Sequence, residues 1–147
     1  MTADSTFPTE LDELAFLLEE VPRALLRRFG ARTQAFGLSR TQWRLLAYLL
    51  RDEGITQTDL ARCLELERVT IGLNLDKMEA KGLVEKRRAP GDRRSWHVYA
   101  RPGARELLPQ LRKEADGTYA EMLAGIRPES LAAFRKVLEA LAANLRS

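Results

Sequence analysis

Apolar residues recur every three or four positions through the first part of the chain, which is the spacing of one face of an α-helix. The stripe consists of Leu14, Leu18, Val21, Leu25 and Phe29. Thr9 precedes this stripe, and a threonine hydroxyl in that position can accept a hydrogen bond from a backbone N–H of the first turn. The pattern predicts one long helix that begins after Thr9, continues to about Phe36 and ends at Gly37.

Two shorter segments each begin with a capping residue that has a polar partner three positions later. Ser39 is followed by Gln42, and Thr56 is followed by Asp59. This spacing lets each pair satisfy the free N–H groups of a first helical turn. The helices that these signals predict span residues 40–51 and 57–64.

A further helix is predicted over residues 68–81, with Gly82 closing it. At about 100° per residue, its apolar side is expected to be buried. The members of that side are Ile71, Leu75 and Met78. The opposite side is expected to face solvent and consists of Val69, Thr70, Leu73 and Lys77. Because only a short linker separates this helix from the one before it, the pair is typical of a helix-turn-helix.

Two runs that favour β-strands follow Gly82, "LVEKRR" at residues 83–88 and "SWHVYA" at residues 95–100. The turn residues "APGD" lie between them, so the two runs are expected to form a hairpin. Strand alternation sets two groups of residues that each share a face. These groups are Val84, Lys86 and Arg88 in the first strand, and Trp96, Val98 and Ala100 in the second.

The C-terminal part predicts two more helices, one from Pro102 to about Ala124 and one beyond the break "GIRPES". The last helix carries an apolar stripe of Leu131, Phe134, Leu138, Leu141 and Leu145. The first helix and these two are too long and too apolar to be covered by so small a core. The simplest cover is a second copy of the chain, which predicts a homodimer.

Positive charge is concentrated in one segment. The whole chain has a formal net charge of +3, but residues 81–105 hold eight Lys or Arg against Glu85 and Asp92. This segment therefore carries +6 and the rest of the chain −3. Such an asymmetry indicates a polyanionic partner for one surface. The alternative is an ordinary solvated charged face.

The sequence offers few means of catalysis. It contains one His and one Cys, with no glycine-rich phosphate loop and no metal-ligand spacing, so we expect no enzyme activity, no cofactor and no metal. A single cysteine cannot form an intramolecular disulfide, which agrees with a reducing compartment. No run is apolar enough to span a membrane and the N-terminus does not resemble a secretory signal, so a cytoplasmic location is expected.

The segments "TIGLNLDKMEAKGLVEKR" and "GDRRSWHV" resemble the MarR family of winged helix-turn-helix transcriptional regulators. The resemblance implies a mainly α fold with a small β-hairpin wing, in which a winged helix-turn-helix core lies between N- and C-terminal dimerisation helices. It divides the chain into residues 1–37 and 102–147 for dimerisation and residues 38–101 for DNA binding. It also implies a homodimer that binds a near-palindromic operator in double-stranded DNA.

For the wing, the resemblance places Arg94 in the minor groove, with Asp92 beside it to fix the guanidinium. A narrow minor groove concentrates negative potential and favours a planar cation. The remaining basic residues of the wing would neutralise phosphates. They are Lys86, Arg87, Arg88 and Arg93. The alternative is that Asp92 and Arg94 only brace the turn.

For the recognition helix, which is the predicted helix over residues 68–81, the resemblance assigns DNA contacts to its solvent face. These contacts are Arg68, Val69, Thr70, Leu73 and Lys77. Thr70 can hydrogen-bond a base or a phosphate, whereas Val69 and Leu73 can contact thymine methyl groups. Many relatives have arginine where this chain has Leu73, and serine or threonine is common at Gly72. A slightly rotated helix with Leu73 buried is the alternative.

Thr56 and Gln57 lie at the positive end of the preceding helix and are expected to contact phosphates. The resemblance also implies a pocket for a small, aromatic effector between the dimerisation helices and the DNA-binding region. Trp43 and Tyr48 are candidates for its lining. We otherwise expect Trp43 in the core and Trp96 at the base of the wing.

Cys63 and His97 invite functional hypotheses that the pattern does not favour. Cys63 lies near Leu60 and Leu64 on its helix and is expected to be a small buried residue, the alternative being a redox sensor. His97 has no second His or Cys for a metal site and alternates away from the inward strand face. We therefore expect an exposed ring, or one beside a phosphate.

Together these observations favour a sequence-specific DNA-binding regulator, more often a repressor than an activator by family habit. The alternative is a winged-helix module that captures another protein without binding specific DNA. Exposed Val69 and Leu73 would favour the module, whereas the basic wing argues against it.

Overall fold

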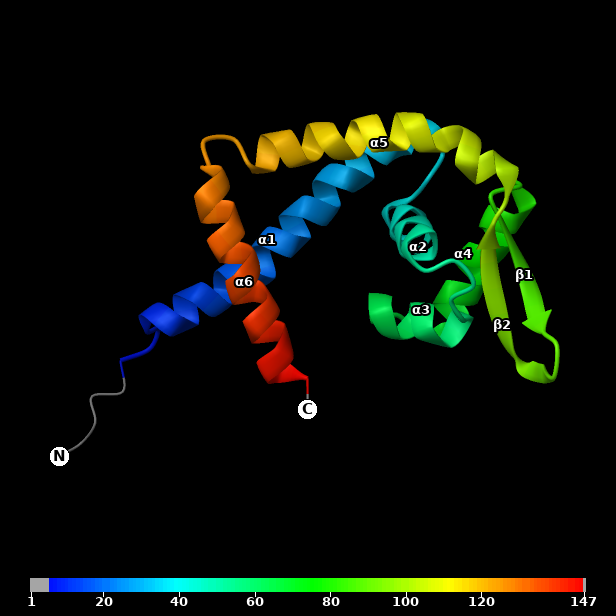
Figure 1. The fold of residues 1–147 in the computed structure, drawn as a ribbon, viewed down its shortest axis with the longest axis horizontal. Coiled ribbons are helices and arrows are strands. Elements are labelled where there is room, and N and C mark those ends of the chain that lie inside the picture. The colour runs from blue at the N-terminus through cyan, green and yellow to red at the C-terminus, as the bar shows by residue number, and fades with distance from the viewer. Residues whose placement is uncertain (1–5, 147) are drawn as a thin grey trace.

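The computed structural model describes residues 6–146 and is mainly helical with one β-hairpin, which confirms the predicted fold class (Figure 1). Residues 1–5 and 147 of the predicted terminal segments lie outside the described part. The elements are α1 (Glu10–Thr33), the 3₁₀-helix η1 (Gln34–Phe36), α2 (Arg40–Arg51), α3 (Gln57–Leu64), α4 (Arg68–Ala80), β1 (Val84–Ala89), β2 (Asp92–Ala100), α5 (Pro102–Met122) and α6 (Pro128–Leu145).

The predicted helix starts are present, and each is explained by contacts within one turn. The Ser39 hydroxyl accepts from the N–H of Gln42 at 3.1 Å, and the Gln42 amide oxygen accepts from the N–H of Ser39 at 3.2 Å. The Thr56 hydroxyl accepts from the N–H of Asp59 at 3.0 Å, whereas the Asp59 carboxylate pairs with Arg62. The caps of α2 and α3 are therefore fixed by neighbouring residues alone.

One hydrophobic core lies under α2, α3, α4, the hairpin and the start of α5. The predicted inward face of α4 is confirmed, since Ile71, Leu75 and Met78 are buried. Cys63, however, is exposed, so the expectation of a buried thiol was wrong. The buried residues of α3 are Leu60, Ala61 and Leu64. They centre the inward face well away from Cys63, which at about 100° per residue lies beyond its edge.

The hairpin has the predicted pairing of faces. Antiparallel register places Val84 opposite Ala100, Lys86 opposite Val98, and Arg88 opposite Trp96. The second strand begins at Asp92, earlier than predicted, because the register shifts at Arg88/Ala89 and lets the turn residues continue the ladder.

The hairpin is also joined to the chain that precedes α3. The N–H of Gly54 donates to the carbonyl of Val98 at 2.9 Å, and the N–H of Val98 donates to the carbonyl of Ile55 at 3.0 Å. A β-bridge between Thr56 and His97 continues this pairing. The base of the wing and the first turn of α3 therefore form one connected unit.

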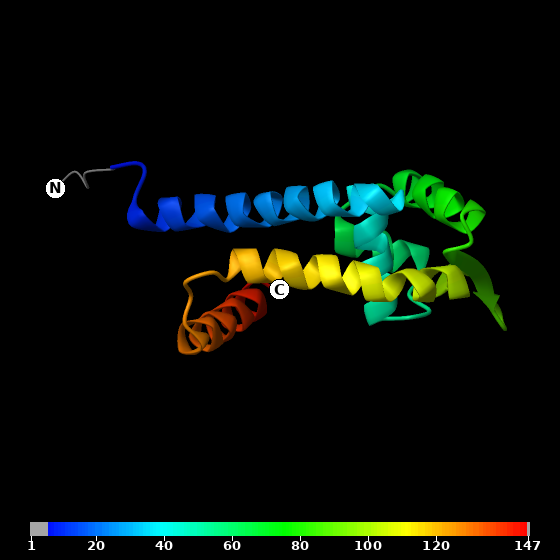
Figure 2. The same ribbon diagram turned by 90° about the horizontal axis from the view of Figure 1, so that it is seen from above.

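The outer helices extend away from this core, with α1 and α5 running side by side and α6 turning back from the end of α5 (Figures 1 and 2). No residue of α6 is buried. Large apolar side chains exposed on the three helices include Leu14, Leu18, Val21, Met122, Phe134, Val137 and Leu138. Below, "the lobe" means residues 38–101, and "the arm" means α1, the second half of α5, and α6.

Within residues 6–146, no helix combines the length and the apolar character that a membrane crossing requires.

Candidate nucleic-acid interface

The outward face of α4 is solvent-exposed and apolar at its centre. The Val69 side chain is 71% exposed and that of Leu73 is 59% exposed, so the alternative of a rotated helix with Leu73 buried was wrong. Arg68 and Lys77 are exposed on the same helix, and Thr70 is half-buried. This face therefore presents two apolar side chains one helical turn apart, with basic residues at either end.

Gly72 lies where the Gln57 side chain of α3 meets α4. A Cβ atom at Gly72 would lie 2.9 Å from the Nε2 atom of Gln57, which is closer than carbon and nitrogen can pack without a shift. The missing side chain leaves room for the half-buried Gln57 amide against α4. A serine or threonine at Gly72 would push this amide away. Because this amide is the end of a flexible side chain, a larger residue at Gly72 would move the Gln57 side chain and leave the two helices in place.

The base of the wing is tied to α4 by an ion pair. The Nζ atom of Lys86 lies 2.5 Å from the Oδ1 atom of Asp76, and the Lys86 side chain is only 20% exposed. We expected Lys86 to face phosphates, but its charge is held by the protein instead. The cause is strand geometry: Lys86 shares the inward face with Val84, and that face meets α4.

The middle of the wing carries arginines that stack on aromatic rings. The guanidinium of Arg88 lies 4.3 Å from the ring centroid of Trp96 and donates to the carbonyl of Arg93. The guanidinium of Arg87 lies 4.4 Å from the ring centroid of Tyr99 and pairs with Glu85. Stacking holds these cations flat against the hairpin, and their charge remains at its surface. The expected packing of Trp96 at the wing takes this form.

The tip of the wing is braced by Asp92. Its Oδ1 atom accepts from the backbone N–H of Arg94 at 3.0 Å. We expected the carboxylate to fix the guanidinium of Arg94, but the ion pairs formed among residues 6–146 do not include Asp92. In this geometry Asp92 orients the turn rather than the side-chain charge.

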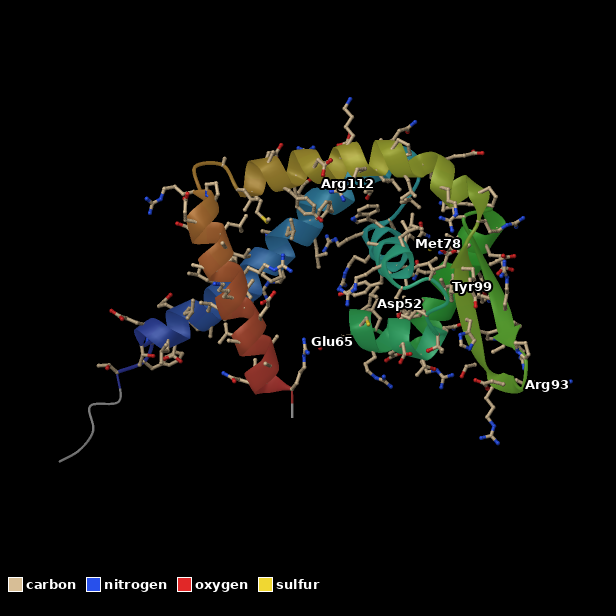
Figure 3. All side chains as sticks on the ribbon, viewed as in Figure 1. Asp52, Glu65, Met78, Arg93, Tyr99 and Arg112 are labelled. Carbon is tan, nitrogen blue, oxygen red and sulfur yellow. The ribbon has the colours of Figure 1, made fainter. Side chains whose placement is uncertain are left out.

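Arg93 and Arg94 differ from the other wing arginines. Arg93 lies at the end of the hairpin (Figure 3), and Arg94 follows it. Both are exposed, and neither guanidinium has a hydrogen-bond or ion-pair partner within the described part of the chain. An unpaired arginine keeps its full hydrogen-bonding capacity for an external anion. The wing tip is therefore the part of this surface best prepared to receive a negatively charged partner.

His97 is placed differently from our expectation of an exposed ring or one beside a phosphate. It is half-buried, and its Nδ1 atom lies 2.9 Å from the carbonyl oxygen of Gly54. Because a carbonyl only accepts, Nδ1 carries the proton in this contact. The Nε2 atom is buried with no hydrogen-bond partner among residues 6–146. The reason for the correction is the pairing of β2 with the chain before α3, which covers this face of the strand.

A pocket of about 300 Å³ lies between α2 and α5 and is lined by Trp43, Leu50, Leu111 and Tyr119 among others. Trp43 also packs against the core and lies 5.9 Å from Phe29, ring centroid to ring centroid. Tyr48 is half-buried and is not part of the lining, so the structure brings only Trp43 of the two candidates to this pocket.

Two arginines, Arg51 and Arg112, give this pocket a cationic rim. The Asp116 carboxylate, one turn along α5, raises the pKa of Arg112 by hydrogen bonding. Its guanidinium is therefore charged at any ordinary pH. Within residues 6–146, no three His, Cys, Asp or Glu side chains gather as metal ligands do.

Several contacts in this region had no signal in the sequence. Asp76, which holds Lys86, and Tyr119, which lines the pocket, each act across two elements. The one exception is Asp76, whose charge on the outward side of α4 suggests a basic partner. The identity of that partner depends on how the hairpin meets α4.

Comparison with known proteins places this arrangement in a family. A family model described as MarR family matches residues 36–95. The uncharacterized HTH-type transcriptional regulator YdgJ of Bacillus subtilis (strain 168) is 29% identical over 143 residues, which cover 97% of this chain and 83% of that protein.

Solved structures agree along nearly the whole chain. The transcriptional regulator PA3341 is 31% identical with a TM-score of 0.81, over 90% of this chain and 97% of that chain. A MarR family transcriptional regulator from Listeria monocytogenes, complexed with a 26mer DNA, is 20% identical with a TM-score of 0.78. That match covers 87% of this chain and 85% of the other, and shows a shared fold. The likeness extends over the arm as well as the lobe.

Proposed function

The chain belongs to the MarR family of transcriptional regulators, and from this we propose that it binds specific double-stranded DNA as a homodimer. The observation that carries the proposal is the pair of unpaired guanidinium groups, Arg93 and Arg94, at a braced hairpin tip beside the exposed face of α4. The Listeria relative was solved in complex with a 26mer DNA, which supports DNA as the partner here.

In this proposal α4 enters the major groove and the wing lies over the adjacent minor groove. Arg68, Thr70 and Lys77 would contact the groove edges from α4, and Arg94 would enter the minor groove. Phosphate contacts would come from several residues, namely Thr56, Gln57, Arg87, Arg88 and Arg93. Lys86 and Asp92 would hold the wing in position through Asp76 and the turn.

The two-fold assembly is proposed from the arm. Residues 1–37 and 102–147 would form the dimer, and residues 38–101 would contact one operator half-site each. The support is the exposed apolar surface of α1, α5 and α6, which a second copy would remove from water. A two-fold protein then requires a near-palindromic operator.

We further propose a small aromatic effector in the pocket that Trp43 and Tyr119 line, with Arg112 available for an acidic substituent. Because the pocket lies between α2 of the lobe and α5 of the arm, an occupant could alter the angle between them and so the spacing of the two lobes. A repressor, working in the cytoplasm, is the simplest form of this regulation.

A second candidate is a module that captures another protein, and the exposed Val69 and Leu73 are the observation in its favour. One experiment separates the two. The full-length protein is offered a random duplex library at low salt, and bound sequences are recovered through rounds of selection. Enrichment of a near-palindromic sequence, with affinity that falls as salt rises, is the expected result. Recovery of no preferred duplex would contradict the proposal.

A further inference from the structure

The face of α4 suggests what kind of base contact this protein makes. Little of the polar surface near the middle of α4 is free. The amide of Asn74 donates to the carbonyl of Thr70 at 2.9 Å, and Thr70 itself is half-buried. Arg68 and Lys77 lie toward the two ends of the helix. What remains at the centre is a pair of exposed aliphatic side chains, Val69 and Leu73.

We infer that Val69 and Leu73 read 5-methyl groups of pyrimidines in the major groove, so that thymine, or equally 5-methylcytosine, is the base each half-site must present. This inference rests on the proposed function. The only hydrophobic feature on a major-groove base edge is the C5 methyl group of thymine. The same methyl group on cytosine occupies the same position, and an aliphatic side chain cannot tell the two apart.

Charge complementarity commits this apolar face to DNA rather than to a protein. The side chains near it include the basic residues Arg68 and Lys77 on α4, and the wing adds Arg93 and Arg94. The carboxylate of Asp76, which also lies on the outward side of α4, is paired with Lys86. A docking site for an apolar protein surface carries little charge at its core. Here basic side chains outnumber the one carboxylate near two apolar side chains, which suits a polyanion that bears isolated methyl groups.

The helix geometry also predicts the spacing of the methyl groups. Val69 and Leu73 are four residues apart, which is about 6 Å along the axis of an α-helix. Successive base pairs of B-DNA are about 3.4 Å apart, so the two side chains reach across no more than roughly two base-pair steps. Each half-site should therefore contain two 5-methyl groups within that distance.

The test uses the duplex recovered by selection with the full-length protein. Each thymine is replaced in turn by deoxyuridine, which removes only the C5 methyl group, and affinity is measured by fluorescence anisotropy. Burial of one methyl group corresponds to roughly a fourfold change in affinity. We expect a loss of this size at two positions in each half-site. Replacing those thymines by 5-methylcytosine, with guanine opposite, should retain more affinity than unmethylated cytosine.

Leu73→Ala and Val69→Ala assign each methyl group to its reader. In each variant, replacing thymine by deoxyuridine at one of the two sensitive positions should no longer change the affinity. The same replacement at the other position should still lower it. Leu73→Met is the matched control, since it keeps an apolar side chain and should keep the sensitivity. Because both residues are exposed on α4, circular dichroism should show unchanged folding.

The outcomes are separable. If no thymine position is sensitive, although the duplex is bound and the affinity depends on salt, the inference is overturned and the proposed function stands. If the sensitivity persists unchanged in both alanine variants, other residues read the methyl groups and the inference is also overturned. If selection recovers no duplex at all, the proposed function itself fails, and the apolar pair then fits a protein partner.

Discussion

The lobe and the arm use the same kind of amphipathic helix with opposite results. In the lobe, the apolar faces of α2, α3 and α4 meet one another and the hairpin, and residues such as Leu46 and Ile71 have no exposed surface. In the arm, the apolar faces of α1 and α6 remain open, and α6 buries no residue. The difference is one of geometry, because short helices joined by tight turns can converge on a common centre.

This contrast separates what stabilises the protomer from what requires a partner. Burial in the lobe stabilises each chain on its own, since its core residues contact one another within residues 38–111. In the proposed homodimer, burial in the arm would depend on a second copy and therefore on protein concentration. Sequence periodicity reports an apolar face in both cases, but it does not report what covers that face.

Removal of α6 should give the largest effect. A chain ending at Gly125 lacks the whole exposed apolar face of α6, so we expect monomer or aggregate at micromolar concentration in place of a dimer. Light scattering coupled to gel filtration measures the mass. A chain ending at Leu145 keeps the helix and is the matched control. An intact dimer in the Gly125 truncation would exclude α6 from the interface.

A pair of leucine truncations tests the contrast at single residues. Leu46→Ala empties a fully buried position in the lobe and should lower the free energy of unfolding by about 2–5 kcal/mol. Leu138→Ala removes a side chain that is 39% exposed in the protomer and should instead raise the dimer dissociation constant. Urea unfolding at several protein concentrations distinguishes the two effects. A concentration-independent loss for Leu138→Ala would contradict the comparison.

Loss of one exposed arginine should weaken operator binding when that arginine lies at the wing tip of the lobe, and not when it lies in the arm. Arg94→Ala removes an unpaired guanidinium from the wing tip, and we expect operator affinity to fall at least tenfold, or about 1.4 kcal/mol. Arg23→Ala removes an exposed arginine of α1 that pairs only with Glu19, and should leave affinity unchanged. Gel-shift titration of both folded variants is the measurement. Equal affinities would remove the wing from the mechanism.

The two capping boxes, one in the lobe and one in the arm, should contribute differently to the free energy of unfolding. The hydroxyls of Ser39 and Thr9 each accept from the backbone N–H three residues later, and their own backbone N–H groups donate to the side chains of Gln42 and Asp12. Ser39→Ala should lower the global free energy of unfolding by about 1 kcal/mol, because α2 is part of the core. Thr9→Ala should only fray the start of α1, which thermal unfolding would scarcely detect. A similar loss in both variants would show that the end of α1 belongs to the cooperative unit.

The smallest effect concerns pH at the end of the arm. Hydrogen bonds from the Thr9 backbone N–H and hydroxyl lower the pKa of Asp12 below its ordinary value of 3.8. A carboxyl group whose pKa is lowered by folding stabilises the folded state at pH values above its ordinary pKa. This stabilisation is lost as the pH falls through the pKa of the folded state. NMR titration should show Asp12 protonating and the Thr9 amide losing protection together, below pH 3.8. Thr9→Ala should move the pKa of Asp12 upward.

Local features of the fold could be predicted from the sequence because they depend on neighbouring residues. The caps at Ser39 and Thr56, the inward face of α4 and the facing strands of the hairpin were all predicted and are present. Errors occurred at the edge of one helix face and where a residue is covered by a distant segment. Cys63 lies just outside the inward face of α3, and His97 is covered by the chain before that helix.

By itself, the sequence determined where helices and strands begin, which helix faces are apolar and where positive charge gathers, since these follow from residues within one or two turns of each other. Tertiary structure decided which charges are available. Lys86 pairs with Asp76, Arg88 stacks on Trp96, and the guanidinium groups of Arg93 and Arg94 have no partner among residues 6–146. The physical reason is that an ion pair depends on side chains meeting within about 4 Å. Only the packing of the hairpin against α4 sets that distance.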